Sequence, residues 1–145
     1  LDYLYPCLIS QFPLEYIIVM LGTNDTKIRY GVNAVEIGYG IDEVLLQIED
    51  VCRRKGQNPV KIVIAPAKLY PKSEWVEFSE ESCRKAIQLT EEYRQIAAIH
   101  KAHFLSAAEI LDEKCIGSDG IHFTEEGHRR LAEEILLLIK NICEK

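Results

Sequence analysis

The stretch "EYIIVMLGTND", residues 15–25, decides the fold of this 145-residue chain. Residues 15–21 form a continuous apolar run with β-branched side chains, which is typical of a strand buried on both faces of a parallel sheet. A glycine and a polar cluster follow directly, so we expect the chain to turn sharply where the strand ends. Similar runs at 60–67 and 102–107 predict two further strands.

Helical patterns alternate with these strands. Residues 41–52 carry an apolar stripe at helical spacing, although Gly38 and Gly40 weaken the pattern upstream. Ser79 can cap a second long helix and Thr124 a last one. Alternating strands and helices favour an α/β fold with a parallel sheet and helices on both faces. We expect one domain over residues 1–145.

Composition excludes several classes of partner. The formal net charge is −6, and without a basic stripe we expect no nucleic-acid partner. No apolar run approaches the roughly 18 residues that a membrane span requires. The five cysteines are odd in number and show no C-x-x-C spacing, so we expect reduced, mostly buried thiols and a cytoplasmic protein. The chain opens inside an amphipathic segment, which suggests a start in mid-domain.

The polar cluster after the first strand contains Gly22, Asn24 and Asp25. An asparagine at this position can present its amide group to an oxyanion that develops during a reaction. Gly22 allows the backbone to turn at the strand exit. The alternative is an ordinary polar turn, in which Asn24 and Asp25 accept hydrogen bonds from nearby backbone N–H groups.

A second polar cluster, "SDGIHFTEEGH" at 118–128, contains Asp119 three residues before His122. Such an aspartate can hold one ring nitrogen of the histidine while the other acts as a general base. The alternative is an aspartate-stabilised turn with a surface histidine. His128 could join Asp119 at a metal, but no supporting ligand motif is present, so we expect neither a metal nor a cofactor.

Together, "VMLGTND" and "SDGIHFTEEGH" resemble the SGNH (GDSL-type) hydrolase superfamily of serine esterases and acylhydrolases. The resemblance implies a flavodoxin-like three-layer α/β/α fold. It also implies that Asn24 is an oxyanion donor and that Asp119 and His122 form the acid–base pair, while Gly22 and Asp25 complete the first block. The opening residues 1–25 look like the arylesterase and carbohydrate-acetylesterase branch, which implies small acyl esters, such as acetyl esters, as substrates.

The chain departs from this family at the nucleophile. The family serine lies in a Gly-Asp-Ser block at the end of the first strand, and that block is absent here. None of the six serines has such a context: Ser10, Ser73, Ser79, Ser82, Ser106 and Ser118. We therefore expect residues 1–145 to be the C-terminal two-thirds of the fold, with the N-terminal strands missing and no nucleophile of its own.

The loop after the second strand carries three aromatic side chains, Tyr70, Trp75 and Phe78. Because it follows the carboxyl end of a strand, it can wall an acyl pocket. Covering the core is an equally good interpretation of the same three residues.

Three functional hypotheses remain open on the sequence. The chain can be part of a serine esterase, alone inactive, or a catalytically inactive domain kept for binding or assembly. A phosphate- or metal-binding domain that uses Asp25 and Asp119 is the third. We expect the strand at 15–21 to pair with the missing N-terminal segment or with a second copy of the chain.

Overall fold

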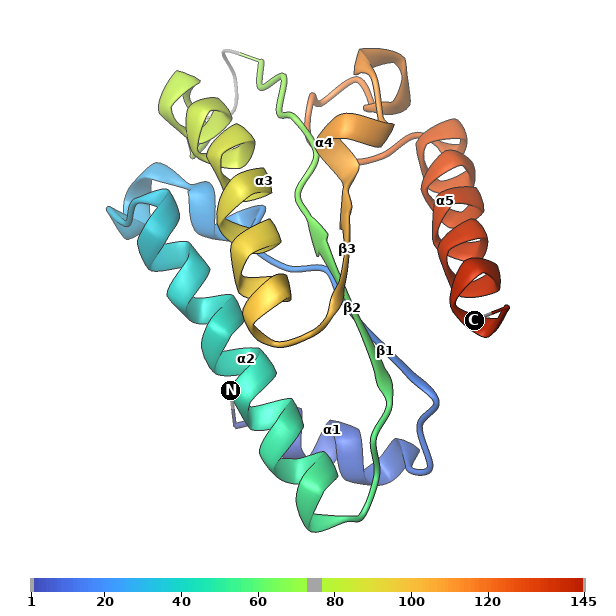
Figure 1. Cartoon of the computed structure of the whole chain (residues 1–145). Helices are drawn as coiled ribbons and strands as arrows, with labels where there is room; N and C mark the ends of the chain where they lie inside the picture. The colour runs from blue at the N-terminus through green and yellow to red at the C-terminus, as the bar shows by residue number, and fades with distance from the viewer. Residues whose placement is uncertain (1, 73–76, 145) are drawn as a thin grey trace.

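A sheet of three parallel strands lies at the centre of the computed structural model, which describes residues 2–72 and 77–144 (Figure 1). The strands are β1 (Tyr16–Val19), β2 (Val60–Ala65) and β3 (His103–Ser106). Their order is β1-β2-β3, with Tyr16 opposite Val60 and Ile62 opposite His103. The predicted α/β class and parallel sheet are confirmed.

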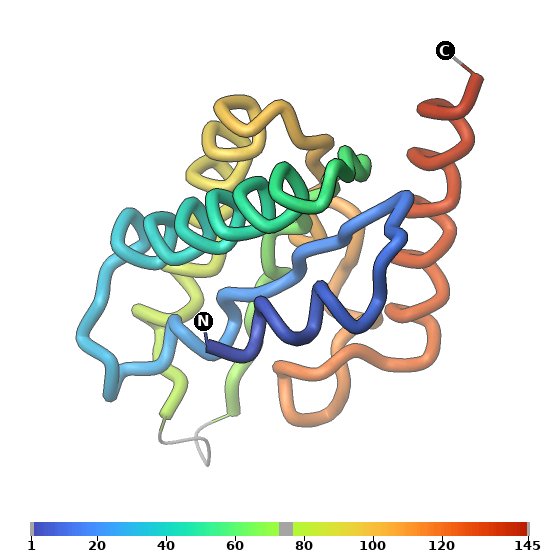
Figure 2. Tube along the Cα trace, turned by 90° about the horizontal axis from the view of Figure 1, so that it is seen from below, coloured from blue at the N-terminus to red at the C-terminus, as the bar shows by residue number. Residues whose placement is uncertain are grey.

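Helices cover both faces of this sheet. They are α1 (Leu4–Gln11), α2 (Ala34–Arg54), α3 (Glu80–Ile99), α4 (Ala107–Ile110) and α5 (Glu125–Cys143). Helices α2 and α3 lie together on one face and α5 lies on the other (Figure 1). Seen from below, α1 runs beside the β1 segment and α5 stands at the edge of the molecule (Figure 2).

Side chains that alternate along β2 divide the core into two clusters. Val63 and Ala65 pack with α2 and α3, whereas Ile62 and Ile64 pack with residues of α5 and the segment before it. All four side chains are at most 1% exposed. Burying one large aliphatic side chain typically contributes about 1.5–3 kcal/mol to the free energy of unfolding, so β2 is the best-anchored strand.

Helix α2 begins at Ala34, well upstream of the predicted helix, and a capping box explains its start. The Asn33 side chain accepts a hydrogen bond from the Glu36 backbone N–H at 2.9 Å, and the Glu36 carboxylate accepts one from the Asn33 N–H at 2.7 Å. Gly38 does not break the helix because it faces α3, where a Cβ atom would come within 3.2 Å of Ile96.

The two helix caps predicted from the sequence are confirmed. The Ser79 hydroxyl accepts a hydrogen bond from the Glu81 N–H at 3.2 Å at the start of α3. The Thr124 hydroxyl accepts one from the Gly127 N–H at 3.1 Å at the start of α5. Each cap satisfies a backbone donor that has no partner within its helix.

All five cysteines are free thiols, but the expectation that most are buried is wrong. Cys52 and Cys115 are buried, whereas Cys7 and Cys143 are exposed and Cys83 is intermediate. Among the described helices, none is both long and apolar enough to cross a membrane.

The apolar strand β1 lies at one edge of the sheet. Within the described residues β1 pairs with β2 alone, so its other edge presents unpaired N–H and C=O groups. Ile18 is 43% exposed and Leu21, just past the strand, is 54% exposed. An apolar strand edge of this kind favours pairing with another strand.

We predict that the purified chain associates through this edge. Light scattering after gel filtration should give a mass above that of the 16.6 kDa monomer. Ile18→Lys should shift the mass towards the monomer, because a charge on an edge strand disfavours pairing. Ile99→Lys, at a side chain 73% exposed at the end of α3, should leave the mass unchanged. A monomeric parent chain would contradict the prediction.

Candidate active site

The two polar clusters meet in one cleft of about 240 Å³. Its lining residues are Thr23, Asn24, Ile121, His122, Phe123 and His128. The first two follow β1, and the others belong to the loop after β3 and to the first turn of α5. The C-terminal ends of parallel strands lie at the same end of the sheet. Segments about a hundred residues apart that follow such strands therefore converge there.

Asp119 and His122 form a hydrogen-bonded pair in this loop. The Asp119 Oδ2 atom lies 2.5 Å from the His122 Nδ1 atom. The Asp119 Oδ1 atom accepts hydrogen bonds from the backbone N–H groups of Ile121 and His122 at 2.9 and 3.0 Å. With a carboxylate as acceptor, Nδ1 carries the proton and Nε2 is left as the basic nitrogen.

These contacts also lower the pKa of Asp119 to about 2, chiefly through the His122 side chain and then through the two backbone donors. The carboxylate therefore stays ionised at neutral pH and keeps the ring oriented. The His122 side chain is 77% exposed, whereas that of Asp119 is 26% exposed. The ring thus stands beside open space at the cleft.

The Tyr93 side chain of α3 packs against the turn that carries Asn24 and fixes its position. Gly22 has a φ of +109°, and a Cβ atom at this position would come 2.2 Å from the Tyr93 hydroxyl. That hydroxyl donates a hydrogen bond to the Leu21 carbonyl at 3.3 Å. Burial, with a smaller contribution from the Asp25 charge, raises the pKa of Tyr93, so the hydroxyl remains a donor.

Asn24 and Asp25 lie on different sides of this turn. Asn24 lines the cleft that contains His122. Asp25 lines a separate hollow of about 340 Å³ together with Gly22, Tyr93 and Glu43. The structure therefore brings Asn24, but not Asp25, to the same cleft as the Asp119–His122 pair.

The loop after β2 makes a backbone contact with residues 119–122, which we call the histidine turn. The Tyr70 N–H donates a hydrogen bond to the Gly120 carbonyl at 2.8 Å. Phe78 is buried in a cluster with Leu69, Ala86 and Ile121. Neither Tyr70 nor Phe78 lines the cleft, and Trp75 lies outside the described residues. The acyl-pocket role of this loop stays a prediction.

Thr23, Phe123 and His128 also line the cleft, and we did not predict this from the sequence. The Phe123 and His128 rings meet edge to face, with centroids 5.5 Å apart and an interplanar angle of 65°. The Thr124 cap was the available signal, because it places residue 128 on the first turn of α5, next to the histidine loop.

None of the described serines lines this cleft. The Ser82 hydroxyl is buried and donates a hydrogen bond to the Thr26 carbonyl at 2.9 Å, and the Ser106 hydroxyl lies 3.2 Å from that of Thr90. Ser79 caps α3. Ser73 lies outside the described residues.

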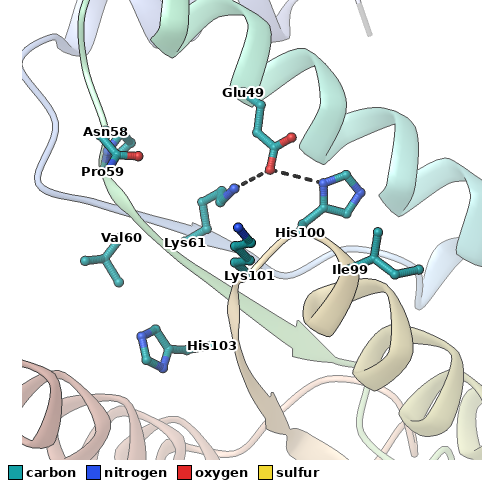
Figure 3. Close-up of a pocket in the computed structure, with 9 residues that line it drawn as sticks. All are labelled: Glu49, Asn58, Pro59, Val60, Lys61, Ile99, His100, Lys101 and His103. Carbon is teal, nitrogen blue, oxygen red and sulfur yellow. Dashed lines mark hydrogen bonds and ion pairs between the residues drawn. The ribbon is translucent and has the colours of Figure 1, made fainter.

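A hollow of about 510 Å³ lies at the other end of the strands from the cleft, where β2 and β3 begin (Figure 3). The His100 Nδ1 atom lies 3.1 Å from the Glu49 carboxylate, which also pairs with Lys61, and its Nε2 atom lies 2.7 Å from Asp42. His100 is buried at the end of α3, and its contacts with Glu49 and Asp42, together with the Glu49–Lys61 pair, connect α2 to α3 and to β2. In the described part of the chain, no group of three or more His, Cys, Asp and Glu could hold a metal.

We predict that Gly120→Ala disrupts the histidine turn. The Gly120 φ is +75°, and a Cβ atom would lie 1.7 Å from the Tyr70 carbonyl oxygen. The free energy of unfolding should fall by more than about 2 kcal/mol in urea denaturation. Gly31→Ala is the matched control: its φ is +63° but nothing lies within 4 Å, so the loss should be about 1 kcal/mol. Equal losses would argue against the contact.

The Asp119–His122 pair predicts a specific response to acid. Because the pKa of Asp119 is lowered to about 2, its contribution to stability should be complete above about pH 4 and lost as the pH falls through 2. The backbone amide NMR signals of Ile121 and His122 should shift with that midpoint. A midpoint near 4 in these signals would show that the pair does not form in solution.

Comparisons with known proteins bear on the family and the fold of this chain. The model of the GDSL-like lipase/acylhydrolase family matches residues 5–130. A carbohydrate acetylesterase from Sinorhizobium meliloti superposes with a TM-score of 0.89 at 30% identity, covering 97% of this chain and 67% of that one. An aryl esterase from M. smegmatis gives a TM-score of 0.87 at 29% identity, covering 97% and 66%. No curated protein matches the sequence at a significant level.

The chain thus spans about two thirds of the length of these solved neighbours. The family match extends over most of the chain and includes both loops of the cleft. The fold of the neighbours is the α/β arrangement described above. We conclude that this chain belongs to the GDSL-like lipase/acylhydrolase family.

Proposed function

We propose that this chain supplies the general base and one oxyanion donor of an ester-hydrolysing site. In this proposal it acts on small acyl esters, such as acetyl esters, together with a serine that lies outside these 145 residues. The observation that carries the proposal is that Asn24 and His122 line the same cleft while Asp119 holds His122 Nδ1. The acetylesterase neighbour supports the choice of acyl group.

Each side chain has a defined role in this reaction. Asp119 keeps the His122 ring in the tautomer with a basic Nε2, which removes the proton from the serine hydroxyl. The serine oxygen attacks the ester carbonyl, and the Asn24 amide donates a hydrogen bond to the oxyanion that forms. His122 then protonates the departing alcohol, and a water molecule activated by His122 releases the acid. Gly22 and Asp25 belong to the turn that positions Asn24.

The free edge of β1 supports the proposed source of the serine. A parallel strand paired there would end at the same edge of the sheet as β1, beside Asn24. A second copy of this chain could cover the edge, but it would bring no Gly-Asp-Ser block. Asp25 lines the hollow beside Tyr93, whereas both carboxylate oxygens of Asp119 are hydrogen-bonded within its own turn. The phosphate- or metal-binding hypothesis therefore gains no support.

We predict that the purified chain alone does not turn over phenyl acetate. Loss of the triad serine typically removes about 10⁶-fold of the rate. Supplying a family N-terminal segment that contains the Gly-Asp-Ser block, as a fusion or a co-expressed fragment, should restore hydrolysis. The same assembly with His122→Ala should be inactive, and His103→Ala, which changes a histidine at the opposite edge of the sheet, should be fully active.

A serine-directed fluorophosphonate should label the restored protein on the added serine alone. Strong activity of the unassisted chain that the same reagent abolishes would show that one of its own hydroxyl groups is the nucleophile. A correctly folded assembly without activity would favour the inactive-domain hypothesis.

A further inference from the structure

We propose that His128 is a positioning residue for His122, and that it acts through the edge-to-face contact of its ring with Phe123. The inference rests on the proposed function, because it gives His128 a part in holding the general base of that site. In this role the His128 imidazole transfers no proton and contacts no substrate. Its ring restrains the loop that carries His122.

The His122 ring depends on its own loop for its position. Its side chain is 77% exposed, and the partner of its Nδ1 atom is Asp119, three residues earlier in the same loop. No hydrogen bond or ion pair in the described part of the chain ties the ring to another element. The position of Nε2 is therefore set by the backbone around His122 and by the contacts that restrain this backbone.

Residues 115–124 form a closed loop whose two ends are paired. Ile116 and Phe123 form an antiparallel bridge, and the Gly117 N–H donates a hydrogen bond to the His122 carbonyl at 2.6 Å. Phe123 follows His122 directly in the chain. A displacement of Phe123 therefore moves His122 with it.

The first turn of α5 packs against the paired end of this loop. A Cβ atom on the buried Gly127 would lie 2.3 Å from the Cys115 carbonyl oxygen and 3.2 Å from the Phe123 Cβ atom, so helix and loop are in direct contact. The next residue, His128, places its ring edge to face against that of Phe123, with centroids 5.5 Å apart. Helix α5 thus restrains Phe123 through its backbone at Gly127 and through the ring of His128.

The exposure of His128 separates this role from a contribution to the core. Phe123 is half-buried and packs against the core cluster on the α5 side, whereas the His128 side chain is exposed. Among the described residues, no hydrogen bond or ion pair involves the His128 ring, so the contact with Phe123 is the interaction that it offers. Substituting an exposed side chain usually changes the free energy of unfolding little, so the loss of this contact should affect the loop rather than the fold.

Hydrogen exchange on the 145-residue chain tests the restraint directly. In His128→Ala the backbone N–H groups of Ile121 and His122 should exchange about two- to tenfold faster, which is the factor that one aromatic pair contributes. The N–H of Val63 in β2 should exchange at the parent rate. His128→Phe should restore the parent rates in the loop, because a phenyl ring makes the same contact without a proton to transfer. Glu134→Ala, at another exposed position on α5, should change none of these rates.

A double variant tests whether His128 acts through Phe123. Phe123→Leu removes the aromatic ring but keeps an apolar side chain, so it should accelerate the same exchange. Adding His128→Ala to Phe123→Leu should give no further increase, because both changes remove one contact. A further increase of about two- to tenfold would show that His128 acts by another route, and it would overturn the inference.

The titration of Asp119 gives a readout that a purely structural role would not move. Contacts within the histidine turn lower the pKa of Asp119 to about 2, with the His122 side chain as the largest cause. A looser His122 ring in His128→Ala should therefore raise the titration midpoint towards the ordinary value of about 4. His128→Phe should keep the parent midpoint.

The assembly that contains the serine gives a kinetic test. His128→Ala should lower kcat by up to about tenfold at unchanged KM, for phenyl acetate and ethyl acetate alike, because a displaced base slows proton transfer for every ester. His128→Phe should restore kcat. His103→Ala, at the other end of the strands, should leave it unchanged.

Unchanged exchange rates in His128→Ala would overturn the inference, and so would an unchanged Asp119 midpoint or a failure of His128→Phe to restore the parent values. A rise in KM for phenyl acetate alone would also overturn it, because the ring would then contact the substrate. An inactive assembly whose chain still shows the exchange and titration effects would contradict the proposed function alone.

Discussion

The parallel pairing of β2 with both of its neighbours is the constraint on which the rest of the structure depends. Its side chains are buried against helices on both faces, and its backbone is hydrogen-bonded along both edges. Because all three strands run in the same direction, the loops that follow them emerge at one edge of the sheet. The cleft exists there because this pairing brings the segment after β1 to the segment after β3.

The two halves of the cleft are held by close backbone contacts. Tyr93 fills the space where a side chain on Gly22 would lie, and the Tyr70 carbonyl fills the space next to Gly120. Both contacts come from neighbouring segments: α3 below the Asn24 turn and the loop after β2 below the histidine turn. Changes in these supporting residues can therefore displace the reacting groups without touching a substrate.

The order of elements and the Asp119–His122 pair could be predicted from the sequence because they depend on local signals. Apolar runs gave the strands, Ser79 and Thr124 gave two helix starts, and the spacing of Asp119 and His122 indicated the hydrogen-bonded pair. The early start of α2 does not follow from helix propensity, because Gly38 packs against Ile96 of α3 and this contact is not a local signal.

What escaped prediction depends on contacts between distant segments. The burial of His100 follows from carboxylates on α2 that are more than 50 residues away, and periodicity carries no such information. The place of His128 in the cleft likewise depends on how α5 leaves the histidine loop. The separation of Asn24 from Asp25 is set by the turn that Tyr93 supports, although the two residues are adjacent in the chain.

The central claim is that Asn24 and His122 act on the two oxygens of one ester group. A crystal structure of the chain assembled with the serine-bearing segment and inactivated by an aryl phosphonate tests it most directly. Our account predicts that the Asn24 amide donates a hydrogen bond to the phosphoryl oxygen and that His122 Nε2 lies within hydrogen-bonding distance of the serine oxygen. An adduct whose phosphoryl oxygen points away from Asn24, or whose serine lies out of reach of His122, would contradict the account.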